Sequence, residues 1–159
     1  MNLAEALSNR ADLQRRISQL KGRLKDSAKV QEGDTPAEDV ETLFLELDSC
    51  LEKQEKLVYQ INCTNVQIMH NGENLTRMLA RRDSLSARVS LMREVLKHVT
   101  ETETRYGRNE IRYIRTVDVE NLRKDTDSYC KQLRELDNLI QSINWTVNLL
   151  YFFSVVLYI

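Results

Sequence analysis

The chain of 159 residues is close to neutral, with 23 Lys and Arg against 24 Asp and Glu, and it has only one Pro and four Gly. This composition excludes a turn-rich sheet protein, and the balanced charge argues against nucleic acid or an acidic membrane surface as a partner. Three Cys, each within a helical stretch, indicate reduced thiols and a cytoplasmic protein. We find neither the pattern of a secretory signal nor a run of ~18 apolar residues that would span a membrane.

The first predicted helix covers residues 2–31. Its seam positions alternate three and four residues apart, which is the heptad pattern of helices packed side by side. The members of this row are Leu3, Ala6, Arg10, Leu13, Ile17, Leu20 and Leu24. Gly22 lies within the helix at a cost of about 1 kcal/mol.

The second predicted helix covers residues 36–70. Thr35 is a good N-cap, Pro36 suits the first helical position, and Glu38 stands where a capping box needs it. Gly72 follows the helix and is placed to adopt a positive φ. The seam row is again regular: Val40, Phe44, Leu47, Leu51, Gln54, Val58, Ile61, Asn65 and Ile68.

Two further helices are predicted over residues 77–104, after Thr76 as N-cap, and over 119–150, after Asp118 as N-cap. The seam of the third helix is Met78, Arg82, Leu85, Val89, Met92, Leu96 and Val99. The seam of the fourth is Leu122, Thr126, Tyr129, Leu133, Leu136, Ile140, Ile143, Val147 and Leu150. Between these helices, residues 111–117 are rich in β-branched and aromatic residues, so we expect a short strand or an extended loop there.

Four amphipathic helices with short connections predict an all-α fold. We expect an antiparallel four-helix bundle of long coiled-coil-like helices, formed as a single domain by residues 1–150. Because the seams run over many heptads, a second copy is expected to pack alongside, giving a homo-oligomer.

The last residues differ from the rest of the chain, since no charged residue occurs between Val147 and Ile159. Residues 151–159 form an apolar tail that as a helix would be too short to cross a bilayer. It is expected to pack on the bundle or at a subunit interface. Membrane contact through residues 149–159 and a non-native end of the chain are the alternatives.

No reactive constellation is present, so we expect no catalytic residue, cofactor or metal site. The two His, His70 and His98, lie on different helices, and Glu94 precedes His98 by four positions where di-iron bundles use Glu-x-x-His. With four Gly there is no phosphate-binding loop, and the three Cys stand beside seam positions, as packing residues do.

One end of the predicted bundle gathers polar residues. The simpler interpretation is that this polar layer only sets the register of the helices, as single buried Asn residues do in coiled coils. A small anion pocket clamped by the two guanidinium groups is the alternative. Asp12, Asp83 and Glu5 are candidate partners for the arginines. The residues of this candidate site are Arg10, Asn62, Asn65, Arg82, Asp83, Asn144 and Trp145.

The connection over residues 105–115 is locally basic, with Tyr106 and Tyr113 between arginines. Such a composition can bind nucleic acid. Since the chain around it is neutral, we expect a structured loop or an intersubunit β-pairing here and no nucleic-acid partner.

Several short motifs resemble septicolysin and septicolysin-like proteins, a family of small bacterial helical proteins. The resemblance covers roughly residues 1–147. Its name implies a haemolysin, and it supplies no catalytic residues. The motifs that carry it are Asn2-Leu3-Ala4-Glu5-Ala6-Leu7, Arg10-Ala11-Asp12-Leu13-Gln14, Val30-Gln31-Glu32-Gly33, Ile61-Asn62, Thr64-Asn65, Leu75-Thr76, Leu79-Ala80-Arg81-Arg82-Asp83, Val117-Asp118-Val119, Leu136-Asp137, Ile140-Gln141 and Asn144-Trp145.

The sequence therefore predicts a non-enzymatic helical bundle that self-associates and acts through protein contacts with a partner it does not identify. Two alternatives come from other classes of protein. The family name and the apolar tail allow a membrane-active cytolysin, and the polar end allows a small anion-binding bundle that uses Arg10 and Arg82.

Overall fold

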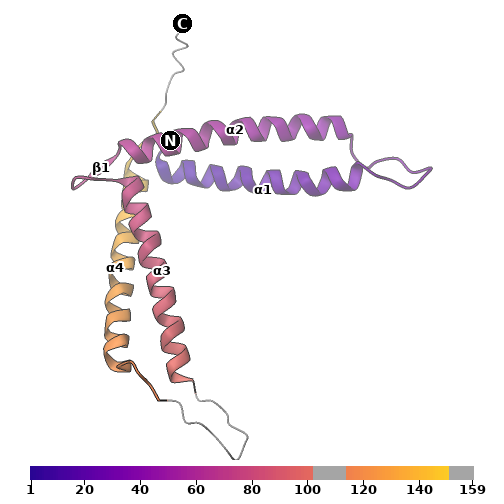
Figure 1. Cartoon of the computed structure of the whole chain (residues 1–159). Helices are drawn as coiled ribbons and strands as arrows, with labels where there is room; N and C mark the ends of the chain where they lie inside the picture. Colours follow the sequence, from indigo (N-terminus) through magenta and orange to yellow (C-terminus); the bar gives the residue numbers. More distant parts are fainter. Residues whose placement is uncertain (102–113, 151–159) are drawn as a thin grey trace, which may run out of the picture. The chain divides into compact units, whose positions relative to one another are not determined.

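The computed structural model describes residues 1–101 and 114–150 and has an all-α fold, as the sequence predicts. Its four long helices are α1 (Leu3–Ser27), α2 (Val40–Gln67), α3 (Leu75–Thr100) and α4 (Val119–Thr146), and a hairpin of β1 (Met69–His70) and β2 (Glu73–Asn74) joins α2 to α3 (Figure 1). The chain divides into two compact units: Met1–Leu75 together with the chain from Gln141 onward, and Thr76–Ile140. The expectation of one domain over residues 1–150 stays a prediction.

The first unit is built on an antiparallel hairpin in which α1 and α2 lie side by side (Figure 1). A capping box begins α1, because the Asn2 side chain accepts from the Glu5 amide and the Glu5 carboxylate accepts from the Asn2 amide. Leu20, Leu43 and Cys50 form the buried centre between the helices. Partly buried apolar side chains pack against this centre: Leu13, Ile17, Leu24 and Leu47.

The predicted start of the second helix is wrong. Thr35 and Pro36 lie in irregular structure, and α2 begins at Val40 with Asp39 as its N-cap. The Asp39 carboxylate accepts from both the amide and the hydroxyl of Thr42, at 2.9 and 2.6 Å, which satisfies an otherwise unpaired amide of the first turn. Glu38 therefore does not take part in the capping box that its position in the sequence suggests.

Asn71 and Gly72 both have positive φ, at 50° and 81°. The positive φ of Gly72 is confirmed, but its role differs from the predicted one, because α2 already ends at Gln67 and Gly72 lies in the turn between β1 and β2. An Asn-Gly pair with two positive φ values is the turn whose twist matches a tight β-hairpin. Seven residues thus separate α2 from α3: Ile68, which is the C-cap of α2, and the six residues of the hairpin.

The fourth helix is shorter than predicted, ending at Thr146 instead of residue 150. The Leu3 amide donates to the Val147 carbonyl at 2.9 Å, and the Leu149 amide donates to the Met1 carbonyl at 3.1 Å. Asn2 and Asn148 form an antiparallel bridge between these two bonds. The extended pairing with the amino-terminal residues replaces the helix over Val147–Leu149.

The second unit contains most of α3 and α4, which lie side by side and contact each other through Arg88 and Tyr129. Their seam rows are buried or half-buried throughout, as predicted. The third helix begins at Leu75, so Thr76 lies inside it and is not its N-cap. Asp118 does cap α4, since its carboxylate accepts from the amides of Glu120 and Asn121.

The prediction for residues 105–115 falls largely on 102–113, outside the described residues, and so do the first three residues of 111–117. Residues 114–118, which the structure does describe, are irregular and contain no strand.

Candidate functional site

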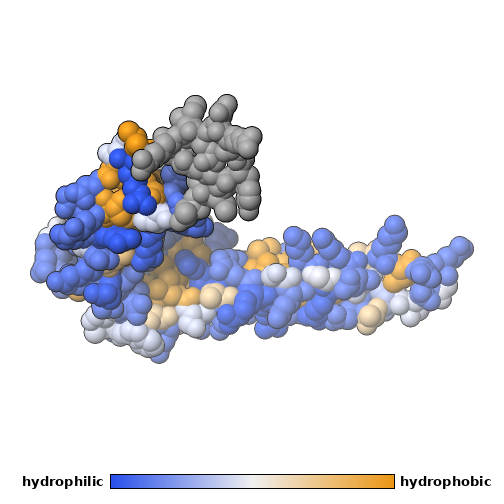
Figure 2. All heavy atoms as spheres, turned by 90° about the horizontal axis from the view of Figure 1, so that it is seen from below, coloured by the Kyte–Doolittle hydropathy of each residue, from blue (hydrophilic) through white to orange (hydrophobic). Residues whose placement is uncertain are grey.

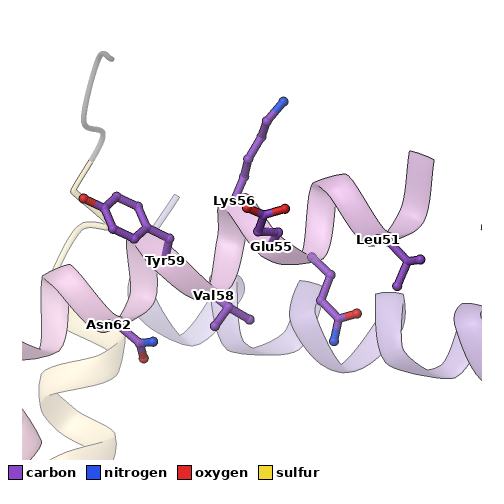
Figure 3. A pocket seen from close by; sticks show the side chains of 7 residues that line it. Leu51, Glu55, Lys56, Val58, Tyr59 and Asn62 are labelled. Carbon is purple, nitrogen blue, oxygen red and sulfur yellow. The ribbon is translucent and has the colours of Figure 1, made fainter. Parts of the chain in front are cut away.

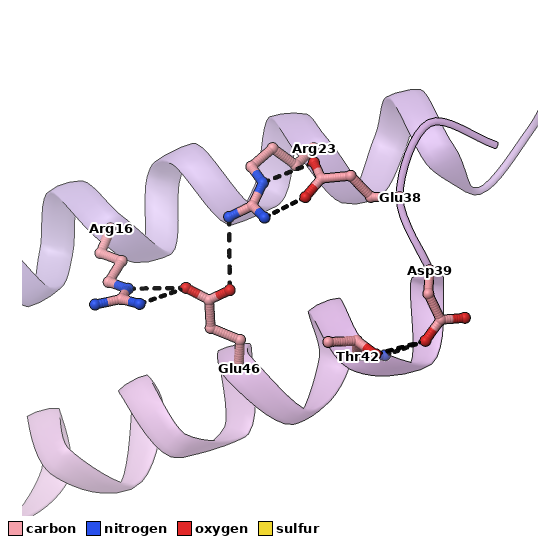
Figure 4. A network of polar contacts seen from close by, with 6 residues as sticks. All are labelled: Arg16, Arg23, Glu38, Asp39, Thr42 and Glu46. Atoms are coloured by element: carbon pink, nitrogen blue, oxygen red, sulfur yellow. Dashed lines mark hydrogen bonds and ion pairs between the residues drawn. The ribbon is translucent and has the colours of Figure 1, made fainter.

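The two long sides of the α1/α2 hairpin differ in chemistry, and the first is closed by ion pairs (Figure 4). Nε of Arg16 donates to the Glu46 carboxylate at 2.9 Å, and the guanidinium of Arg23 binds Glu38 through two of its nitrogens. Arg23 also reaches Glu46 at 3.5 Å, which links the pairs into one network. We call this side, made by Arg16, Arg23, Glu38 and Glu46, the paired flank.

The ion-pair network shifts the pKa values of Glu38 and Arg16. The hydrogen bond from Arg23 lowers the pKa of Glu38 below its usual value, and the hydrogen bond with Glu46 raises the pKa of Arg16. Each shift favours the charged form, as expected for fork-shaped guanidinium–carboxylate pairs. The paired flank therefore holds α1 and α2 together along one side while remaining in contact with solvent.

On the opposite side of the hairpin, the rotation of α2 about its helix axis decides which of its residues are exposed. Most of the predicted seam is correct, but Phe44 and Leu51 are exposed. The other members are buried or half-buried as expected: Val40, Leu47, Gln54, Val58, Ile61, Asn65 and Ile68. The most deeply buried row of α2 also includes positions one residue earlier than predicted: Leu43, Cys50, Leu57 and Thr64. Since one residue corresponds to a turn of about 100°, the next positions along the chain point to one side of this buried row. We call them the outer row: Phe44 and Leu51, which are exposed, and Val58 and Asn65, which are half-buried.

The outer row leaves apolar surface exposed on α2. Phe44 is 52% exposed and Leu51 is 45% exposed. Ile17 and Leu24 each follow one of the paired arginines in the sequence, so each lies about 100° round α1 from Arg16 or Arg23. These two partly buried residues are therefore on the side of the hairpin away from the ion pairs. In the space-filling view, apolar residues lie between hydrophilic ones along the elongated hairpin (Figure 2). We call this second side the open flank: Leu13, Ile17, Leu24, Phe44, Leu47 and Leu51.

A shallow groove of about 720 Å³ continues the outer row toward the end of α2 (Figure 3). Tyr59, 61% exposed, stands on its edge, and a hydrogen bond with Cys63 raises the pKa of its phenol. The groove is lined by Leu51, Gln54, Glu55, Lys56, Val58, Tyr59 and Asn62, all from α2.

Arg10 of the predicted polar layer is half-buried, and its Nε is buried with no hydrogen-bond partner among the described residues. Two of its candidate partners are engaged elsewhere. Asp12 pairs with Arg15, and Glu5 closes the capping box of α1. An unpaired buried donor is costly, and among the described residues Arg10 is the member of the predicted site that has one.

The other predicted site residues are divided between the two units. Asn65 and Asn144 are half-buried in the first unit, where Asn62 and Trp145 are exposed. Arg82 and Asp83 belong to the second unit and pair with each other, with Nε of Arg82 3.0 Å from the carboxylate of Asp83. The proposed pocket between Arg10 and Arg82 stays a prediction.

A search of residues 1–101 and 114–150 finds no group of three or more His, Cys, Asp or Glu placed to hold a metal ion. Over the same residues, no helix is both long enough and apolar enough to cross a membrane. The three cysteines are unbridged, with Cys50 buried and Cys63 and Cys130 half-buried.

The sequence analysis missed the open flank because it assigned one seam to α2 where two overlap. Rows beginning at Val40 and at Leu43 are both regular heptads and share every second member. A helix with two adjacent apolar rows packs against partners on two sides. This double row is the signal that could have identified the surface.

These features define an all-α protein with an exposed apolar helix face on its α1/α2 hairpin. The chain belongs to the family described as "Family of unknown function (DUF6847)", whose model matches residues 10–149. It is similar to the protein in "Crystal structure of a functionally unknown conserved protein from Corynebacterium diphtheriae", with 40% sequence identity and a TM-score of 0.88. The match covers 94% of this chain and 99% of that one. No curated protein matches this chain. The resemblance to septicolysin-like proteins stays a prediction.

Proposed function

We propose that this protein is a non-enzymatic cytoplasmic module that self-associates through the open flank and acts through protein contacts. One observation carries the proposal: the α1/α2 hairpin is closed by ion pairs on one side and leaves Phe44 and Leu51 exposed on the other. An apolar stripe bordered by polar residues is typical of a protein–protein interface.

The energetics favour covering this flank. Burying a Phe or Leu side chain contributes about 1.5–3 kcal/mol relative to leaving it in water. Two helices packed as a pair share only one interface, which leaves some apolar side chains partly in contact with water. These are the half-buried residues Leu13, Ile17, Leu24 and Leu47. A second hairpin placed on the open flank would complete a four-helix arrangement.

Charges beside the open flank favour a second copy in one orientation. Glu41, Asp48 and Glu55 are exposed at seven-residue spacing along α2, so two α2 helices placed face to face would bring acidic rows together. Lys21 and Lys25 are exposed beside the flank on α1. We therefore propose a two-fold dimer in which α1 of each copy lies over α2 of the other.

The ion pairs of the paired flank set the levels of the two helices. Arg16 lies level with Glu46, and Arg23 with Glu38, so Lys21 lies about level with Glu41. In the proposed dimer the two-fold axis runs parallel to the helices, and α1 of each copy lies over α2 of the other. Lys21 of one copy then approaches Glu41 of the other. The lysine stem would cover Phe44 while the ammonium group stays at the rim.

The test compares two neighbouring exposed residues of α2. Phe44→Glu places a charge on the open flank, and Leu45→Glu makes the same change about 100° round the helix, where Leu45 is 71% exposed. We expect light scattering after size-exclusion chromatography at micromolar concentration to give a dimer for the unmodified chain and for Leu45→Glu. Phe44→Glu is expected to be monomeric, with unchanged helical circular dichroism. A folded Phe44→Glu variant that remains a dimer would contradict the proposal.

A further inference from the structure

Arg10 stands at one end of the open flank with incomplete hydrogen bonding. It precedes Ile17 by seven residues, about two helical turns, so the two side chains leave α1 on the same face. Arg10 is half-buried, and its Nε is buried without a hydrogen-bond partner among the described residues. Because a guanidinium group has only donors, an acceptor is needed there, and an oxyanion is the strongest one.

The acidic residues expected to pair with Arg10 are engaged elsewhere. Asp12 pairs with another arginine of α1, and Glu5 closes the capping box of that helix. Asp83 belongs to the second unit, where it binds the arginine that precedes it. The acceptor for Arg10 is therefore none of its three predicted partners.

The proposed dimer places two copies of Arg10 in one layer. A two-fold axis parallel to the helices leaves every residue at its own level, so Arg10 of one copy is level with Arg10 of the other. The levels set by the paired flank put Leu51 about level with Arg10. Gln54 lies about 4 Å further along α2 at 1.5 Å per residue, and it is half-buried in the row of Leu47. Its side-chain amide can donate to an acceptor in this layer.

Such a layer needs a negative charge. Two guanidinium groups in one layer of an apolar interface repel each other and lose part of their hydration. A doubly charged oxyanion matches their charge, and the planar fork of each guanidinium fits two of its oxygen atoms. The acidic row of the other copy is placed less well for this role, because Asp48 and Glu55 are exposed at the rim and lie about 5 Å above and below this level.

We propose that the two copies of Arg10 together bind one free oxyanion of the phosphate class, with Gln54 as a further donor, and that this anion stabilises the dimer. The inference rests on the proposed function, because the site is complete only when two copies associate. The anion supplies the acceptor that Nε of Arg10 lacks among the described residues. Association of the two copies then depends on the concentration of the anion.

Sedimentation velocity of the full-length chain in inorganic phosphate and in chloride, at equal pH and ionic strength, tests the proposal. We expect phosphate at about ten times its dissociation constant to tighten the dimer by about tenfold, because a ligand that binds only the dimer strengthens association by mass action. Arg10→Met removes the guanidinium and keeps a long side chain, so this variant should form a dimer that phosphate does not affect, with unchanged helical circular dichroism. Arg15→Met is the matched control, because Arg15 is exposed on a different face of α1 and its loss should leave the full response.

The results that would overturn the proposal can be told apart. A dimer of the unmodified chain with the same dissociation constant in phosphate and in chloride excludes the anion and leaves the proposed function intact. Equal tightening of all three chains would be a general effect of phosphate on apolar association. Loss of the Arg10→Met dimer in both buffers would show that Arg10 pairs with a carboxylate of the other copy. An unmodified chain that is monomeric in both buffers contradicts the proposed function and this inference together.

Discussion

At the scale of single residues, the glycines show how backbone conformation separates positions that look alike in the sequence. Gly72 has a φ of 81° and Gly33 a φ of 94°, where a side chain is strained. Gly22 lies inside α1, and a Cβ added there would meet no atom within 4 Å. The positive φ of Gly72 and the place of Gly22 within a helix both follow from local rules and are confirmed; the cost of Gly22 stays a prediction.

Two glycine variants should therefore change stability in opposite directions. We expect Gly22→Ala to stabilise the fold by about 1 kcal/mol, since alanine is the better helix former. We expect Gly72→Ala to destabilise it by roughly 1–2 kcal/mol, because alanine must then adopt a positive φ. Urea unfolding of the two variants beside the unmodified chain measures both effects. Stabilisation by Gly72→Ala would contradict the hairpin turn described above.

At the scale of elements, the type and approximate place of all four helices follow from the sequence, but their ends and rotation do not. Asp39 replaces Thr35 as the cap of α2 because its carboxylate binds two groups of Thr42. The end of α4 is set by pairing with Met1 and Leu3, residues distant in sequence. The rotation of α2 depends on its packing against α1, through the core of Leu20, Leu43 and Cys50. A heptad pattern seen on one helix cannot choose between two apolar rows that share members.

The paired flank should make the first unit sensitive to acid. The hydrogen bond from Arg23 lowers the pKa of Glu38 below its usual value of 4.5. A carboxylate with a lowered pKa contributes stability above its unfolded-state pKa, and this contribution is lost as the pH falls through the folded-state value. We expect Glu38→Gln to lower the urea midpoint at pH 7 and to lose that effect toward pH 3. An effect of the same size at both pH values would show that the carboxylate charge does not matter.

At the scale of the whole molecule, the account rests on a surface that the chain itself leaves partly uncovered. The four helices confirm the predicted all-α fold class, and the candidate site predicted from the sequence is a polar layer around Arg10. The structure directs attention to the apolar flank instead, since Phe44 and Leu51 are exposed where burial was expected. Long-range packing decides which residues are exposed, and in the sequence only the double apolar row of α2 indicates this surface.

A charge exchange tests the orientation of the proposed dimer. Lys21→Glu and Glu41→Lys should each weaken association, because each places like charges at the level where the two copies meet. The double variant restores opposite charges and should recover most of the lost affinity, by about threefold to tenfold over either single variant at low salt. Sedimentation velocity over a concentration series measures this. Additive weakening in the double variant would rule out the orientation with α1 over the partner's α2.

The most direct measurement of the central claim is the mass of the unmodified chain in solution. The chain has a mass of 18.6 kDa. Sedimentation equilibrium at micromolar concentration is predicted to give twice this value, with dissociation on dilution. A single species with the mass of one chain, even at high micromolar concentration, would contradict self-association through the open flank.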